Sequence, residues 1–139
     1  MSLLQRVVFD TNLYIHWLNQ GLCGEWMGKK PMVRYLSSIV HMELRLGAQT
    51  RSAHQAVDQL VRGYGSRLLV PTAPMYDQTA RVLQRLRAKG LEIRKASLVN
   101  DVLIALSARS IGATLVTLDR DFETIQTLCD FRLERIKPV

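Results

Sequence analysis

Residues 6–12 constrain the fold more than any other part of this sequence. Residues 7–9 form a short, wholly apolar run, which is typical of a strand buried on both faces of a parallel sheet. Asp10 follows directly, and Thr11 or Asn12 can cap a helix that begins there. Open α/β sheets bind their ligands at the carboxyl ends of parallel strands. We therefore expect Asp10 to lie at a functional edge of the sheet.

Strand-like and helix-like segments alternate along the rest of the chain. Apolar runs predict strands at 7–9, 32–36, 67–70 and 114–117, and alternating residues predict an edge strand at 131–135. Three-and-four spacing predicts helices over 12–20, from Ser37 or Ser38 to about Gln49, over 52–64, from the cap Thr72 to Gly90, over 98–111, and from Asp119 or Asp121 through Leu128. Residues 21–31, with three glycines, are expected to form a loop. The pattern predicts a single α/β domain over residues 1–139, a three-layer α/β/α sandwich with a mainly parallel sheet of four to five strands.

Charge and cysteine content narrow the functional class. The net charge of +7 and the pI near 9.9 favour a polyanionic partner. Cys23 and Cys129 lack metal-type spacing and fit structural thiols in a reducing compartment. No apolar run is long enough to span a membrane, and residues 1–5 do not have the pattern of a signal peptide. We expect a cytoplasmic protein with no membrane contact.

Four acidic residues are expected to converge at the carboxyl edge of the sheet. Asp10 ends the first strand, and Asp119 lies two residues beyond the fourth. Asp101 falls in the expected first turn of the helix that leads into the fourth strand, and Glu43 lies early in the helix after the second. Both helix starts lie near the same edge because these helices run antiparallel to the strands. The chain has only 12 acidic residues, so this placement carries information.

Clustered carboxylates repel one another and raise one another's pKa values. A divalent cation relieves this repulsion, and an all-oxygen ligand set suits Mg²⁺ or Mn²⁺. Such a cation supports hydrolysis of a phosphodiester bond. Taken singly, Asp10 is equally compatible with a helix cap, Asp101 with a favourable charge at a helix N-terminus, and Glu43 and Asp119 with exposed or loop positions.

Four segments resemble the PIN domain family, specifically the VapC-like toxins of bacterial toxin–antitoxin pairs. The segments are VVFDTN at 7–12, SSIVHMEL at 37–44, NDVLIALSA at 100–108 and LVTLDRDF at 115–122. They span nearly the whole chain in the order and spacing of the family.

The resemblance implies a small α/β/α sandwich that is an Mg²⁺- or Mn²⁺-dependent endoribonuclease. It implies that Asp10 and Asp101 are the principal metal ligands, with Glu43 and Asp119 binding through water or holding a second ion. Thr11 and Thr117 match supporting hydroxyls, and Asp121 matches a fifth acid whose role relative to Asp119 stays open. The family usually cuts single-stranded or looped RNA, forms homodimers and is inhibited by a small antitoxin that fills the acidic pocket.

Basic and aromatic residues offer further candidates for RNA contact. Arg81, Arg85 and Lys89 recur every four residues and predict a basic stripe on one helix face, which Arg87, Arg94 and Lys95 extend. A solvated helix face is the simpler interpretation for each of them. Trp26 in the glycine-rich segment is a candidate for stacking on a base, whereas Trp17 fits the core or a dimer interface.

Two other functional classes remain open. A catalytically silent binding module would use the acidic cluster only to receive a basic partner peptide. A nuclease of the same fold with DNA or a housekeeping RNA as substrate would have no role as a toxin.

Overall fold

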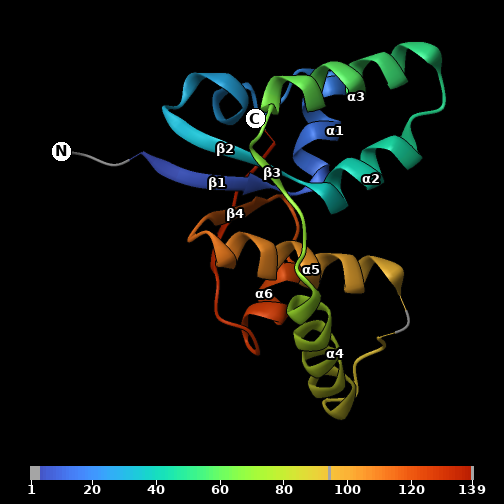
Figure 1. Cartoon of the computed structure of the whole chain (residues 1–139), viewed down its shortest axis with the longest axis vertical. Coiled ribbons are helices and arrows are strands. Elements are labelled where there is room, and N and C mark those ends of the chain that lie inside the picture. Colours follow the sequence, from blue (N-terminus) through green and yellow to red (C-terminus); the bar gives the residue numbers. More distant parts are fainter. Residues whose placement is uncertain (1–3, 94, 139) are drawn as a thin grey trace.

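A five-stranded, all-parallel sheet in the order β3-β2-β1-β4-β5 forms the centre of the molecule (Figure 1). The computed structural model describes residues 4–93 and 95–138. The strands are β1 (Gln5–Phe9), β2 (Met32–Ser37), β3 (Leu68–Leu69), β4 (Thr114–Thr117) and β5 (Arg132–Arg135). The predicted α/β fold is confirmed, with the strand at 131–135 at one edge. The predicted strand at 67–70 shortens to two residues at the other edge.

Helices cover both faces of the sheet. They are α1 (Thr11–Gln20), α2 (Ser38–Gly47), α3 (Arg51–Tyr64), α4 (Ala73–Ala88), α5 (Ala96–Ser110) and α6 (Asp121–Gln126). Figure 1 shows α1, α2 and α3 on one side of the sheet and α4, α5 and α6 on the other. This division follows from the strand order. The chain moves from β1 to β3 in one direction and then back across to β4 and β5 in the other, and right-handed crossovers in opposite directions place their helices on opposite faces.

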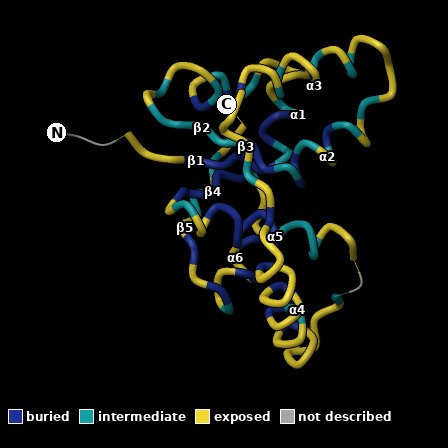
Figure 2. The backbone as a smooth tube through the Cα atoms, in the orientation of Figure 1, coloured by how far each residue is buried: buried dark blue, intermediate teal, exposed yellow. Residues whose placement is uncertain are grey.

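The central strands and α5 form the most deeply buried part of the core (Figure 2). Residues 7–9 of β1 and all four residues of β4 are buried, as expected for strands with neighbours on both sides. Helix α5 is buried over residues 102–108, so it lacks the polar stripe of a surface helix. The site residues that flank these elements are therefore attached to the most rigid part of the protein.

Several local expectations are wrong in detail. The cap of α1 is Asp10 rather than Thr11 or Asn12, since its carboxylate accepts a hydrogen bond from the Thr11 backbone. Residues 25–29 form a π-helical turn, η1 (Glu25–Lys29), inside the segment expected to be a loop. In α4 the buried face is formed by Met75, Thr79, Val82 and Leu86. The three-and-four spacing of apolar residues between Thr72 and Gly90 also predicts Tyr76 and Ala80 on this face, but both are exposed.

Both cysteines are buried and free, in agreement with the prediction of structural thiols. In residues 4–93 and 95–138, no helix has the length and apolar character needed to cross a bilayer.

We predict that Ser37→Ala lowers the free energy of unfolding by about 1 kcal/mol. The fully buried Ser37 hydroxyl accepts hydrogen bonds from the backbone N–H groups of Ile39 and Val40 at 3.1 and 3.4 Å, and alanine leaves both donors unpaired. Urea denaturation followed by circular dichroism measures the change. Ser38→Ala is the matched control, because the described residues give its hydroxyl no hydrogen bond; an equal loss there would contradict the capping role.

Candidate metal-binding site

Asp10 lies where β1 ends and α1 begins. Its carboxylate is almost fully buried, with the residue 7% exposed. Oδ1 accepts a hydrogen bond from the Thr11 backbone N–H at 2.8 Å, and Oδ2 accepts one from the Thr117 hydroxyl at 3.0 Å. These two donors fix the carboxylate while leaving lone pairs on both oxygens for a further ligand.

The register of the sheet explains the contact with Thr117. Phe9 pairs with Val116 in the parallel ladder, so the residues that follow each of them, Asp10 and Thr117, also lie side by side. The Thr117 hydroxyl donates to Asp10 and accepts a hydrogen bond from the Asp119 backbone N–H at 3.0 Å. One buried hydroxyl thus couples the position of Asp10 to the turn that carries Asp119.

Glu43 joins the cluster from the neighbouring helix. The Thr11 hydroxyl donates to Glu43 Oε1 at 2.7 Å. Glu43 lies in the middle of α2 rather than early in it, and the side chain still reaches the start of α1. Thr11 therefore has two roles, since its backbone N–H holds Asp10 and its hydroxyl holds Glu43.

Asp101 completes the cluster from the opposite layer. It lies in the second turn of α5, not in the first, so interaction with the helix N-terminus does not explain it. Burial, together with the smaller effect of the negative charges on Asp10, Glu43, Asp119 and Asp121, raises the pKa of Asp101 to about 8. Burial also raises the pKa of Asp10 to about 6, against the opposing effect of its hydrogen bonds with Thr11 and Thr117.

Asp119 and Asp121 occupy the exposed rim of the cluster. Asp119 follows β4, and its Oδ1 accepts a hydrogen bond from the Asp121 backbone N–H at 3.2 Å. Asp121 is the first residue of α6. The Asp119 carboxylate is thus partly engaged in shaping the turn, whereas no hydrogen bond from a described residue occupies the Asp121 carboxylate.

The sequence profile of the PIN domain matches residues 7–128 of this chain. The chain belongs to the PIN domain family. Its fold is that of VapC-like PIN domains, as predicted from the four segments.

Solved structures of toxin–antitoxin complexes are similar over nearly the full chain. DNA-bound VapBC from Salmonella typhimurium is 27% identical and has a TM-score of 0.70, with 95% of this chain and 98% of that chain covered. VapBC2 from Rickettsia felis, bound to a DNA fragment from its promoter, is 25% identical with a TM-score of 0.71 and coverage of 96% and 100%. VapBC-5 from Mycobacterium tuberculosis, at 21% identity, a TM-score of 0.65 and coverage of 94% and 98%, shares the fold.

The donor set of this PIN domain fits a hard divalent cation. All five acidic side chains offer oxygen ligands, and burial together with the neighbouring negative charges raises the pKa values of Asp10 and Asp101. In the described side-chain positions, no three acidic, histidine or cysteine residues are arranged closely enough to enclose an ion by themselves. The oxygen donors fit such a metal in chemistry, and water would have to complete its coordination.

Asn12 contributes to the site in a way that the sequence did not indicate. Its side-chain oxygen accepts a hydrogen bond from the Leu118 backbone N–H at 3.4 Å. The amide thereby links the start of α1 to the turn that carries Asp119. Its place in the sequence suggested only a helix cap, because a cap and a cross-strand contact use the same residue type.

The aromatic candidate for base stacking is wrong. Trp26 is buried, 9% exposed, and Lys30 Nζ lies 3.8 Å from the centre of its ring, so both the core and a cation already occupy this side chain. Trp17, expected in the core or a dimer interface, is 36% exposed.

Arg81, Arg85 and Lys89 are exposed, as a basic stripe requires, and Arg94 lies outside the described residues.

We predict that Asp101→Asn stabilises the metal-free protein by about 2 kcal/mol or more at pH 8. The pKa of Asp101 is about 8 in the folded protein and 3.8 in the reference state, so folding favours the protonated acid. The free energy of unfolding of the wild type therefore falls as the pH rises between these two values, and the gain from asparagine shrinks toward pH 4. Urea denaturation in chelator across this pH range measures both effects.

The matched control is Asp130→Asn, which removes an exposed acid outside the cluster. A pH-independent gain in Asp101→Asn, or an equal gain in the control, would contradict the raised pKa of Asp101.

Proposed function

We propose that this PIN domain is a metal-dependent endoribonuclease that acts as the toxin of a toxin–antitoxin pair. The observation that carries the proposal is the cluster of Asp10, Glu43, Asp101 and Asp119, with Asp121 at its rim. Two of these carboxylates have raised pKa values although polar contacts hold one of them in place. Such an arrangement costs folding free energy, and binding a cation at the position of a scissile phosphate offsets that cost.

The proposed mechanism assigns positions to the residues of the chain. Asp10 and Asp101 would be the principal ligands of Mg²⁺ or Mn²⁺, and Glu43 and Asp119 would support the same ion or a second one. When bound, the metal supplies Lewis-acid stabilisation of charge on the phosphoryl group and lowers the pKa of water. Thr11 and Thr117 keep Glu43 and Asp10 in place by their hydroxyl hydrogen bonds, of 2.7 and 3.0 Å. No nucleophile from the protein is required.

The similar structures support the role as a toxin. The VapBC complexes from Salmonella typhimurium and Rickettsia felis match this chain over at least 95% of its length at 25–27% identity. We propose a small cognate antitoxin as the partner that blocks the acidic pocket, and a homodimer in the cytoplasm as the working form. A protein of net charge +7 is also suited to an RNA substrate.

We predict that the purified protein cleaves a structured RNA pool with Mg²⁺ or Mn²⁺ and that a chelator abolishes the cleavage. Asp10→Asn and Asp101→Asn each reduce the rate at least about 100-fold, because each removes a ligand charge where negative charge develops on the phosphate. Gel analysis of end-labelled RNA measures the rates. Glu25→Gln, which changes an exposed acid of η1 away from the cluster, retains full activity.

Cleavage that survives in both site variants would show a contaminant or a different site. Absence of cleavage, together with tight RNA or peptide binding without metal, would replace the nuclease by a catalytically silent binding module.

We further predict that induced expression of the wild-type protein arrests growth of a bacterial host, whereas Asp10→Asn does not. The reason is that a toxin acts through its nuclease site. Growth curves and viable counts measure the arrest, with immunoblots to confirm equal protein levels. Normal growth with an active wild-type enzyme would refute the role as a toxin and favour a housekeeping RNA or a DNA substrate.

A further inference from the structure

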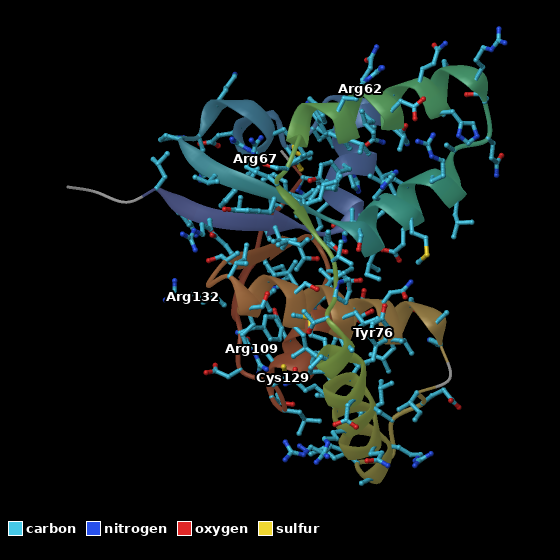
Figure 3. All side chains as sticks on the ribbon, in the orientation of Figure 1. Arg62, Arg67, Tyr76, Arg109, Cys129 and Arg132 are labelled. Carbon is cyan, nitrogen blue, oxygen red and sulfur yellow. The ribbon has the colours of Figure 1, made fainter. Side chains whose placement is uncertain are left out.

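A basic trough lies on the α4–α5–α6 side of the molecule, outside the acidic cluster. Two adjoining hollows of about 230 and 440 Å³ share Arg109 and Asp130 in their walls. Arg81 and Arg85 of α4 line the first hollow, and Arg132 of β5 lines the second. Figure 3 shows Arg109 and Arg132 on the same side of the lower half of the molecule. We call the surface formed by Arg81, Arg85, Arg109 and Arg132 the basic trough.

The guanidinium groups of the trough are only weakly engaged. Arg85 Nη1 lies 3.5 Å from the Leu128 carbonyl oxygen, and Arg109 Nη1 lies 3.9 Å from Cys129 Sγ, both long contacts. Over the described residues, neither of these arginines nor Arg132 forms an ion pair. Each guanidinium has five N–H donors, so most of the donors that face the trough are available to a ligand.

The charge of the trough favours an anion. Among the described residues, Asp130 is the only acid in the walls of the two hollows. Arg81 also pairs with Asp77 through an Nε–Oδ2 contact of 2.9 Å, but both side chains are largely exposed and such a pair is weak. Arginines brought together from a strand and two helices repel one another unless negative charge lies between them.

The basic residues named for the trough are all arginines, and this favours phosphate as the ligand. The planar fork of a guanidinium matches two phosphate oxygens, and phosphate contacts hold a strand in place without regard to its sequence. Two hollows in succession along one surface suit successive phosphates of a chain better than a single carboxylate. The sequence indicated Arg81 and Arg85 but neither Arg109 nor Arg132, because these two reach this surface only through the fold.

The trough lies within reach of a strand cut at the acidic cluster. Asp101 and Arg109 belong to the same helix, α5, and eight residues of helix span roughly 12 Å. A nucleic acid strand advances about 3.4 Å per stacked nucleotide, so a few nucleotides bridge this distance.

We propose that the basic trough binds the backbone phosphates of the RNA strand that flanks the cleavage position. The proposal rests on the proposed function for the identity of the ligand. The trough supplies affinity for longer RNA and takes no part in bond cleavage.

The test measures binding without cleavage. Fluorescence anisotropy in chelator follows a labelled polyuridine strand of about 16 nucleotides at salt concentrations between about 50 and 200 mM. We expect Arg85→Gln/Arg109→Gln to weaken binding about 10-fold and to reduce the salt slope by about 1.4, the value for two lost phosphate contacts. If the first variant folds poorly, Arg85→Gln/Arg132→Gln replaces it, because this variant leaves the end of α5 unchanged. We expect it to give the same result.

The matched control is Arg51→Gln/Arg62→Gln, which removes the same charge from α3 on the other side of the sheet (Figure 3). Equally weakened RNA binding in the control and trough variants would overturn the proposal. Displacement of the RNA by polyglutamate at equal charge would also overturn it, because it would identify an acidic protein segment as the ligand. Metal-dependent cleavage assays are run in parallel. If only the trough variants lose RNA binding, the result supports the trough, even where the wild type cleaves no RNA. A wild type that binds RNA but does not cleave it would refute only the proposed nuclease activity.

Discussion

The burial of carboxylates gathered at the end of a strand, together with their mutual repulsion, is the constraint on which the site depends. Asp10 is almost fully buried, and the negative charges of four other acids contribute to the raised pKa of Asp101. The fold tolerates this because Thr11 and Thr117 hold Asp10 by hydrogen bonds and because β1 and β4 are themselves fixed in the core. A backbone less firmly packed would relax and separate the charges, so rigidity of the central strands is a condition for keeping the cluster together.

The strand order explains why acids from both layers meet at one point. The chain adds β2 and β3 on one side of β1 and then β4 and β5 on the other, so the direction of the crossovers reverses between β1 and β4. Parallel sheets open a crevice at the carboxyl edge where this reversal occurs. Glu43 approaches that crevice from α2 on one face, and Asp101 approaches it from α5 on the other. The hydrogen bond from Thr117 to Asp10 spans the two strands at the reversal.

Much of this arrangement is predictable from the sequence because it depends on short-range patterns. The apolar runs at 7–9 and 114–117 specify buried parallel strands, and an acid after each specifies the edge. The orientation of side chains was less predictable. Tyr76 fits an apolar face by spacing and is 54% exposed, whereas Trp26 lies in a segment of loop-like composition and is buried. Both outcomes depend on which neighbour covers the side chain, and local sequence does not contain that information. The same reason hid the contacts of Asn12 and the contribution of Arg109 to the basic trough.

The distribution of charge over the molecule connects the two surfaces. Five of the 12 acidic residues belong to the acidic cluster, so the remaining surface is more basic than the net charge of +7 implies. A phosphate backbone is attracted to that surface and repelled by the cluster as long as the carboxylates lack a counter-ion. Binding of a divalent cation offsets part of the negative charge, and does so only at the cluster. Two separate effects therefore govern binding of a polyanion. The basic surface attracts it to the protein, whereas approach of one of its phosphates to the acidic cluster depends on the metal.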